Sequence, residues 1–333
     1  MIAIAATLKK GRTRPRRGVR PVRPLTDPGF TCWEVVAPAS TSNLGPGFDC
    51  LGLGLQLRMH ARATRIPSGF SIRRLGEGSD LALDPNHDKI LGSFRHLFRI
   101  AKEAVPSVAL TVRSNIPLQR GLGSSASAVV CGLMLANHWM KSRFTTEDLF
   151  REAIRLEGHP DNVAPSLYGG LTLSMPRLDG GTEALHLHVP RDIQLTLAVP
   201  MIRVSTEEAR ALLPASLPLR YAVANTARAL ALQHALCSHR FELLAEALRD
   251  VYHVPYRARL IPGFDRVVEA GCRAGAFGVT ISGSGPTLLA LHPPGLGGRV
   301  GEAMVQAFAR HRVQARAIEG HIAAKGAVAR TIR

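Results

Sequence analysis

Apolar and polar residues recur along the chain with two different spacings, and each spacing predicts a type of element. Short or alternating apolar runs are typical of strands, and apolar residues at i, i+3, i+4 and i+7 are typical of helices. Strands are predicted at residues 32–36, 51–63, 108–112, 171–174, 186–189, 193–199, 279–281 and 288–291. Helices are predicted at residues 90–104, 126–140, 146–156, 222–238, 241–249 and 300–311, with Thr146 as an N-cap. Because strands and helices do not alternate regularly, the pattern indicates an α+β fold.

A glycine-serine segment, residues 116–128, leads directly into the most apolar of these helices. Gly121 and Gly123 permit positive φ and a close approach of the backbone. Ser124 or Ser125 suits the N-cap position. The segment should therefore present free N–H groups at the positive end of a helix, and such a place binds phosphate. The alternative is an ordinary loop that only caps a core helix.

This segment differs from the common phosphate loops that contain a lysine. A Walker A loop requires Gly-Lys followed by Ser or Thr, but none of the six lysines lies in residues 116–128. The protein-kinase triplets His-Arg-Asp and Asp-Phe-Gly are also absent from the sequence. Phosphate would have to be held by backbone N–H groups, hydroxyl groups and a metal ion.

The formal net charge of +17 raises the alternative of a basic nucleic-acid-binding protein. Eight of the 42 lysines and arginines, however, lie in residues 1–24, which contain no acid. A segment of this composition cannot build a core. Residues 1–30 are therefore predicted to be a disordered basic extension, or to precede the true start of translation. The modest surplus of positive charge in the rest of the chain suits ligands that carry phosphates or carboxylates.

Two further features of the composition concern location. No apolar run approaches the ~20 residues that a membrane-spanning helix needs. The five cysteines are odd in number, scattered and without a Cys-x-x-Cys pair, which is typical of reduced thiols. We therefore expect a cytoplasmic protein without a membrane partner, a disulfide framework or a zinc site.

Five segments resemble, in family order, the homoserine kinase branch of the GHMP kinase superfamily. They are PASTSNLGPGFDCLGLGL (38–55), PLQRGLGSSASA (117–128), HPDNVAP (159–165), STEEARALLP (205–214) and PYRARLIPGF (255–264). The resemblance implies an N-terminal ribosomal-S5-domain-2-like domain with a left-handed crossover over residues 31–180. It also implies a ferredoxin-like C-terminal domain over residues 181–333. The turn-rich residues 176–181 are the predicted boundary between the two domains.

The same resemblance implies an activity. It is ATP-dependent phosphorylation of the side-chain hydroxyl of L-homoserine to O-phospho-L-homoserine, a step of threonine biosynthesis, with Mg²⁺ as the metal. It implies no nucleic-acid partner and allows a homodimer. The enzymatic alternative is a GHMP kinase for another small alcohol. Mevalonate-type relatives carry a lysine in the first motif, where this chain has Ser40 and Thr41.

Residue roles follow from the resemblance, position by position. The ATP-binding residues are Pro117, Leu118, Gln119, Arg120, Gly121, Leu122, Gly123, Ser124, Ser125, Ala126 and Ser127. The substrate-binding residues are Asn43, Asp49, Asp161, Arg210 and Arg257, with Asn162 and Arg210 as the catalytic residues. The metal ligands are Ser125 and Glu157, and Glu152 is the alternative to Glu157. Each charged residue also has a structural interpretation: an Asx turn, a helix cap or a surface cation.

Three positions depart from the patterns of relatives. Asn162 falls where mevalonate-type kinases have a catalytic aspartate, and an amide cannot accept a proton at neutral pH. The prediction is therefore base-free catalysis by orientation and electrostatic stabilisation. Lys89 stands where relatives usually have an asparagine near the adenine, and Val254 replaces an acidic or amide residue before Pro255.

Overall fold

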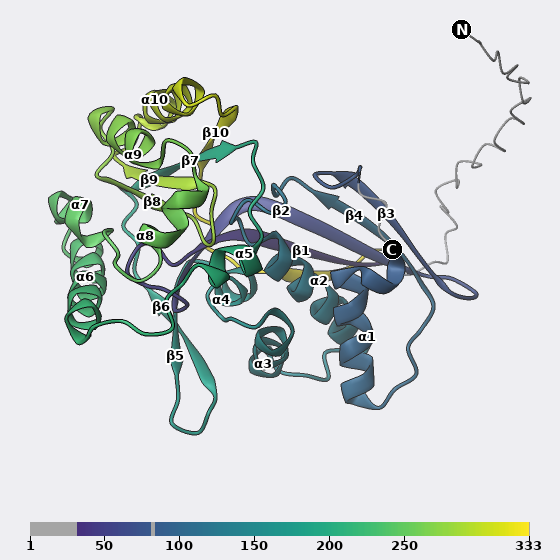
Figure 1. The fold of residues 1–333 in the computed structure, drawn as a ribbon. Helices are drawn as coiled ribbons and strands as arrows, with labels where there is room; N and C mark the ends of the chain where they lie inside the picture. The colour runs from purple at the N-terminus through teal and green to yellow at the C-terminus, as the bar shows by residue number, and fades with distance from the viewer. Residues whose placement is uncertain (1–31, 81–83, 333) are drawn as a thin grey trace, which may run out of the picture.

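The computed structural model describes residues 32–80 and 84–332, so the predicted extension at residues 1–30 lies outside the described residues. A large mixed sheet forms one half of the described structure (Figure 1). Its strands are β1 (Cys32–Ser42), β2 (Leu51–Arg65), β3 (Phe70–Gly76), β4 (Val108–Ser114), β5 (Leu171–Pro176), β6 (Thr182–Leu187) and β11 (Val328–Ile332). The order is β11-β1-β2-β4-β3, and β5 joins the sheet through β2 and then pairs with β6.

Helices pack against this sheet and complete the first half. They are α1 (Lys89–Ala101), α2 (Ser124–Trp139), α3 (Thr146–Glu157) and α4 (Val163–Tyr168), with a short 3-10 turn η1 (Pro85–His87) before α1. β3 and β4 are parallel neighbours, and the chain between them passes through α1. The helix α2 is apolar on most of its surface because it contacts β1, β2, α1, α3 and α4. Its N-terminus therefore has a fixed position above the sheet.

The second half is a four-stranded antiparallel sheet with two helices. Its elements are β7 (Gln194–Pro200), α9 (Phe264–Arg273), β8 (Gly278–Ile281), β9 (Leu288–His292), α10 (Gly297–Arg310) and β10 (Ala315–Gly320). The strand order β10-β7-β9-β8 and the succession of two strand–helix–strand units form a ferredoxin-like arrangement. The predicted α+β class and the predicted ferredoxin-like second half are thus confirmed.

A helical segment between β7 and α9 extends the second half toward the first. It contains α5 (Thr206–Ala211), α6 (Leu219–Cys237), η2 (Phe241–Leu243), α7 (Leu244–Ala247), α8 (Val254–Arg257) and η3 (Ala258–Leu260). One hydrophobic cluster joins the halves, since Leu53 of β2, Leu195 of β7, Leu232 of α6 and Leu291 of β9 all belong to it. Figure 1 shows α5 in the middle of the molecule.

Several sequence predictions need correction. Neither Ser124 nor Ser125 caps α2: the N-cap is Gly123, with φ of 66° and no side-chain cap, which leaves both serine hydroxyls free for other contacts. The N-cap of α3 is Thr145, not Thr146, because Thr145 forms a capping box with Asp148. The predicted boundary at residues 176–181 falls at the connection between the paired strands β5 and β6; the chain passes to the second sheet between β6 and β7 and returns to the first between β10 and β11.

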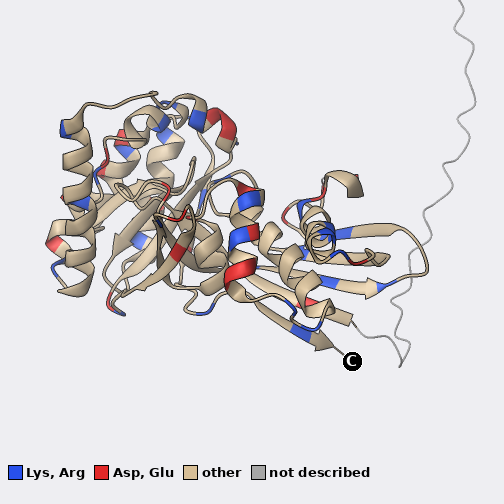
Figure 2. Ribbon diagram, turned by 90° about the horizontal axis from the view of Figure 1, so that it is seen from below, with Lys and Arg blue, Asp and Glu red and all other residues tan. Residues whose placement is uncertain are grey.

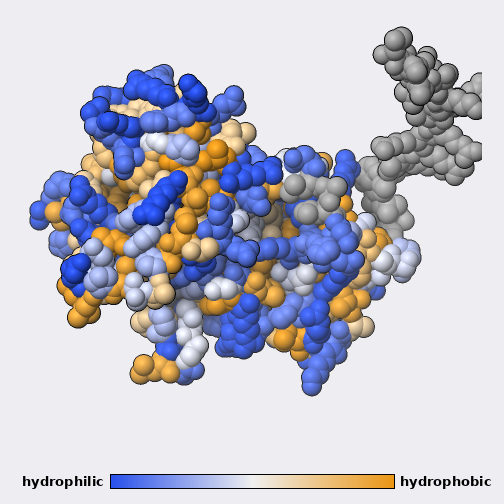
Figure 3. All heavy atoms as spheres, in the orientation of Figure 1, coloured by the Kyte–Doolittle hydropathy of each residue, from blue (hydrophilic) through white to orange (hydrophobic). Residues whose placement is uncertain are grey.

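The surface of the described residues mixes charges and polarities. Figure 2 shows lysines and arginines interspersed with aspartates and glutamates along the ribbon. On the face shown in Figure 3, hydrophobic side chains form separate groups among hydrophilic ones. In the part of the chain that the structure describes, no helix has the length and apolar character needed to cross a membrane.

Candidate active site

A cavity of about 680 Å³ lies where segments from both halves meet. Its walls come from the loop between β1 and β2, the start of α2, the loop between α3 and α4, the helices α5 and α8, and the turn between β8 and β9. Most of the predicted site residues line it. They are Asn43, Asp49, Gln119, Arg120, Gly121, Leu122, Gly123, Ser124, Ser125, Glu157, Asp161, Asn162, Arg210 and Arg257.

Four residues predicted to bind ATP are not part of the cavity wall: Pro117, Leu118, Ala126 and Ser127. Ala126 is fully buried in the core. The Ser127 hydroxyl lies 2.8 Å from the Pro38 carbonyl oxygen and 3.0 Å from that of Gly123, so it ties α2 to the first motif. Ala126 and Ser127 thus pack into the body of the protein behind the loop.

The glycine-serine loop is pressed against the β8–β9 turn. Gly121 has φ of +71°, and a Cβ there would lie 2.1 Å from the Ser282 carbonyl oxygen. The Ser282 hydroxyl donates to the Gly121 carbonyl at 2.7 Å. Only glycine permits this approach at positive φ. The turn that contains Gly283 and Gly285 thus packs on the loop.

Replacing Gly123 with valine should abolish ATP binding while the protein still folds. A Cβ at this position would lie 1.9 Å from Ser40 Oγ and 3.0 Å from Asn162 Oδ1, and φ is +66°, so the loop must shift. Calorimetric titration with ATP measures the loss, and circular dichroism verifies the fold. Gly69→Val is the matched control, since φ is +77° there and nothing lies within 4 Å. Unchanged nucleotide affinity in the Gly123 variant would refute the phosphate-loop role.

Ser125, in the first turn of α2, contacts Glu157, the last residue of α3. The Ser125 hydroxyl donates to Glu157 Oε2 at 2.6 Å. Lys89 Nζ donates to the same hydroxyl and lies 3.3 Å from the same carboxylate oxygen. Glu152 instead pairs with His96 and Arg155 and does not line the cavity. The structure thus places Glu157, rather than Glu152, beside the loop.

Asn162 links the first motif to the third. Its Oδ1 accepts from Ser40 Oγ at 2.8 Å, and its Nδ2 donates to Ser42 Oγ at 2.8 Å. The same Nδ2 lies 3.4 Å from Asp161 Oδ1, and the Asn162 backbone N–H donates to that oxygen at 2.9 Å. Asn162 is mostly buried, so these partners hold its amide in one orientation.

His159 is a site residue that the sequence prediction missed. Its Nδ1 lies 2.5 Å from Asp161 Oδ1, and it lines the cavity. Burial disfavours the imidazolium, but the hydrogen bond and charge of Asp161 outweigh burial and raise the pKa of His159. Burial likewise favours a neutral Asp161, but His159, Ser42 and Arg210 lower the pKa of this carboxyl below its ordinary value. The motif His-Pro-Asp-Asn was the available signal for this pair.

Asp49 and Arg210 bind each other across the cavity mouth. Two guanidinium N–H groups donate to the two carboxylate oxygens at 3.0 and 2.6 Å, which is the bidentate geometry that arginine favours. The hydrogen bond to Asp49 outweighs burial and raises the pKa of Arg210. The resemblance implied contacts of each residue with substrate, and the structure adds a direct contact between them.

Arg257 is a buried cation with no carboxylate within salt-bridge distance in the described residues. It donates to the carbonyl oxygens of Gly283 at 3.1 Å and Ala209 at 3.4 Å. Burial, with a contribution from Arg210, lowers the pKa of Arg257 to about 10, so the side chain stays charged at neutral pH. A buried charge of this kind is costly unless an anion pairs with it. Arg257 therefore adds to this wall a positive charge that has no carboxylate within salt-bridge distance among the described residues.

Asn43 has a structural role in the same wall. Its Nδ2 donates to the Gly283 carbonyl at 2.8 Å, and its Oδ1 accepts the backbone N–H of Asp49 at 3.0 Å. Asn43 and Asp49 both have positive φ, of 71° and 58°. The amide thus fixes the backbone conformation that presents the Asp49 carboxylate.

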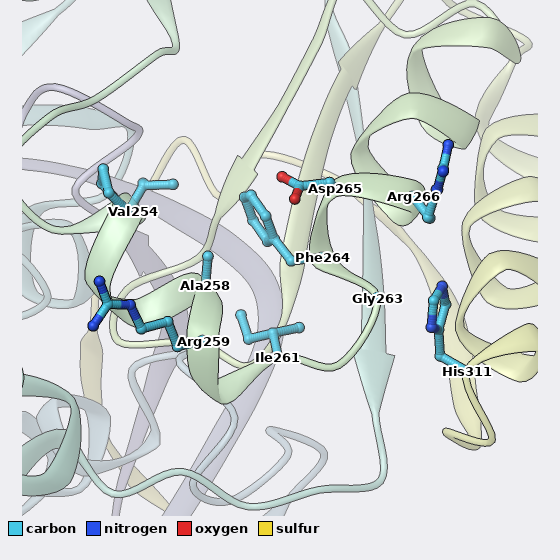
Figure 4. Close-up of a pocket in the computed structure, with 10 residues that line it drawn as sticks. Val254, Ala258, Arg259, Ile261, Gly263, Phe264, Asp265, Arg266 and His311 are labelled. Carbon is cyan, nitrogen blue, oxygen red and sulfur yellow. The ribbon is translucent and has the colours of Figure 1, made fainter.

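A second cavity, of about 620 Å³, is lined by residues of α8 and of segments that follow it (Figure 4). Its walls come from α8, the segment that follows, the start of α9 and a residue after α10. Arg259, Phe264, Asp265, Arg266 and His311 line it, and none of the predicted site residues does. The candidate active site is therefore the cavity at the glycine-serine loop.

Comparison with known proteins agrees with this geometry. The family model described as GHMP kinases N terminal domain matches residues 88–170, and that described as GHMP kinases C terminal matches residues 232–310. A homoserine kinase of Carboxydothermus hydrogenoformans is 37% identical over 294 residues, which cover 88% of this chain and 95% of that protein. The chain belongs to the homoserine kinase family. A homoserine kinase of Gloeobacter violaceus is 43% identical over 260 residues, or 77% of this chain and 86% of its own.

Solved structures agree with the family assignment. The crystal structure of homoserine kinase from Cytophaga hutchinsonii superposes with a TM-score of 0.80 at 28% identity, over 90% of this chain and 97% of that one. A mevalonate kinase from L. major, at a TM-score of 0.64 and 16% identity, shares the fold alone. As a member of the homoserine kinase family, the protein is a kinase enzyme.

Proposed function

We propose that the protein transfers the γ-phosphoryl group of ATP to the side-chain hydroxyl of L-homoserine and produces O-phospho-L-homoserine for threonine biosynthesis. The observation that carries the proposal is a single cavity that combines the glycine-serine loop with the buried cation Arg257 and the carboxylates Asp49 and Asp161. The loop suits a triphosphate. The charged groups suit a small zwitterion with one carboxylate and one ammonium group.

Each end of the zwitterion has a partner of opposite charge. We assign the substrate carboxylate to Arg257, whose planar guanidinium matches two oxygens and which has no carboxylate partner of its own among the described residues. We assign the substrate ammonium to Asp49, with Asp161 as a second negative group. Arg210, held by Asp49, would then lie beside both the substrate and the phosphates.

Asn162 is the proposed orienting residue for the reacting hydroxyl. Its amide is fixed by Ser40 and Ser42 and lies next to Gly123 of the loop. An amide cannot act as a general base. Catalysis would therefore come from orientation and from electrostatic stabilisation of the transferred group, which phosphoryl transfer mainly requires.

Transfer from ATP generally needs a divalent metal, and we propose Mg²⁺. The residues fit it: the Ser125 hydroxyl and the Glu157 carboxylate are 2.6 Å apart, and Mg²⁺ is usually bound by one or two carboxylates together with substrate phosphates. Among the described residues no group of three or more His, Cys, Asp or Glu side chains could hold a metal alone. When bound, the metal would neutralise charge on the phosphates.

Partners and location are further parts of the proposal. The interspersed charges of the described residues (Figure 2) support a phosphate-binding enzyme rather than a nucleic-acid-binding protein. We propose a cytoplasmic enzyme without a membrane partner.

The family resemblance allows a homodimer. Three apolar side chains are exposed on α6, and a second copy of the chain could cover them: Leu219, Val223 and Leu230.

Purified protein with Mg²⁺ and ATP should turn over L-homoserine far better than mevalonate or shikimate. The paired acidic and basic residues fit a zwitterion, and mevalonate lacks an ammonium group for Asp49. A coupled assay of ADP release gives kcat/KM for each alcohol. Equal or better turnover of mevalonate would contradict the homoserine assignment and favour the alternative, a GHMP kinase for another alcohol.

A further inference from the structure

Lys89 is the one lysine among the described residues that lines the cavity. The family resemblance implies a position near the adenine, but the structure brings the Lys89 ammonium to the start of α2, at the glycine-serine loop. Lys89 Nζ donates to Ser125 Oγ and lies 3.3 Å from Glu157 Oε2. The side chain of Lys89 is 57% exposed, whereas that of Glu157 is 8% exposed. The lysine therefore reaches from solvent onto a nearly buried carboxylate.

Close helix packing fixes the base of this side chain. Lys89 is the first residue of α1, and the Asp88 side chain caps this helix through the N–H of Leu91. The first turn of α1 lies against Gly132 of α2, where an added Cβ would be 2.2 Å from the Ile90 carbonyl oxygen. Gly132 lies two helical turns after Ser125, on the same face of α2. Lys89 is thus held over the start of α2.

The electrostatic setting of Lys89 is unfavourable for a cation. The residue stands at the N-terminus of α1, and its ammonium lies at the N-terminus of α2. Both helix ends carry partial positive charge and favour anions. In the described residues Glu157 is the carboxylate that compensates Lys89. A polyanion at this place would meet two helix ends and an ammonium group together.

We propose that Lys89 binds the phosphates of the nucleotide and so supplies the ammonium group that the glycine-serine loop lacks. In the nucleotide-free protein its ammonium occupies the oxygens of Ser125 and Glu157 and so competes with a divalent ion for them. With nucleotide bound, the Lys89 side chain turns so that its ammonium donates to a phosphate oxygen instead. Ser125 and Glu157 then become free to bind the metal. This inference rests on the proposed role of the loop in binding ATP.

Two binding measurements without homoserine test the proposal. In Lys89→Met, calorimetry in EDTA should show ATP bound about tenfold or more weakly than in the native protein, because one charge-assisted contact is lost. Mn²⁺ binding to the nucleotide-free variant, followed by electron paramagnetic resonance, should become several-fold tighter, because the competing ammonium is gone. Lys89→Arg should retain most of the metal-free ATP affinity.

Arg99→Met is the matched control, since it removes one exposed cation from the other end of α1. It should change neither measurement. The proposal requires both changes in Lys89→Met. If metal-free ATP affinity or Mn²⁺ affinity stays at the native value, Lys89 is only a surface partner of Glu157 and the proposal is wrong. Since neither measurement uses homoserine, failure of the substrate assignment would appear separately, in the turnover assay of the native protein.

Discussion

Replacing Asn162 with aspartate should lower kcat for homoserine phosphorylation by about a hundredfold or more. The new carboxylate would lie beside Asp161, whose Oδ1 is now 3.4 Å from Asn162 Nδ2, and both positions are buried. Two carboxylates at this distance cannot both ionise easily, so one would bind a proton. The amide donor to Ser42 would be lost, and at higher pH, where the shared proton leaves the pair, the second negative charge would repel the transferred phosphoryl group. Stopped-time assays of phosphohomoserine across pH 6–9 measure the effect.

Asn162→Ala separates the missing amide from the added charge. The alanine variant should lose activity without a new pH dependence, whereas the aspartate variant should be slower still. A clear increase in kcat for Asn162→Asp that grows with pH would mean that the site was lacking a base. The base-free mechanism would then be wrong.

Replacing Arg257 with lysine should reduce kcat/KM for homoserine ten- to a hundredfold, with little change in KM for ATP. The guanidinium donates to the carbonyl oxygens of Gly283 and Ala209 and still has N–H groups for a substrate carboxylate. A single ammonium cannot serve all of these acceptors or form a fork with two oxygens. One charge-assisted contact contributes ~1.5–3 kcal/mol, which corresponds to this range. Initial-rate kinetics with each substrate varied in turn measure it.

Asp49→Asn should give the complementary loss at the ammonium end, again in KM for homoserine rather than for ATP. Arg259→Lys is the matched control, because Arg259 lies two residues after Arg257 but lines the other cavity. Thermal unfolding of every variant shows whether the fold is intact. If Arg257→Lys raised both Michaelis constants equally, or neither, the carboxylate assignment would have to be abandoned.

Several elements with clear apolar periodicity could be predicted from the sequence, although the amphipathic helix α9 was not. The helix α2 and the strands β2, β4 and β9 lie within a few residues of their predicted ranges, because each buries an apolar face. The strands β3, β10 and β11 were missed. Their burial patterns are largely exposed or half-buried, so they lack an apolar signal. β11 also pairs with β1, whose residues lie nearly 300 positions earlier.

The composition of the site was predictable, but the contacts within it were not. The motifs singled out Asn43, Asp49, Asp161 and Arg257, and the structure brings these four residues together in one cavity. The pairing of Asp49 with Arg210 joins residues 161 positions apart, and no local spacing reveals it. The position of Lys89 depends on how closely α1 approaches α2 at Gly132, which is a property of tertiary packing.

Phosphorus NMR of the reaction product tests the central claim most directly. The full chain is incubated with ATP, Mg²⁺ and L-homoserine, and the spectrum of the product is recorded with and without proton coupling. We predict a new phosphomonoester signal coupled to the protons of the terminal methylene group of homoserine, formed in equal amount with ADP. An acyl phosphate signal, or ADP release without any phosphorylated homoserine, would contradict the account.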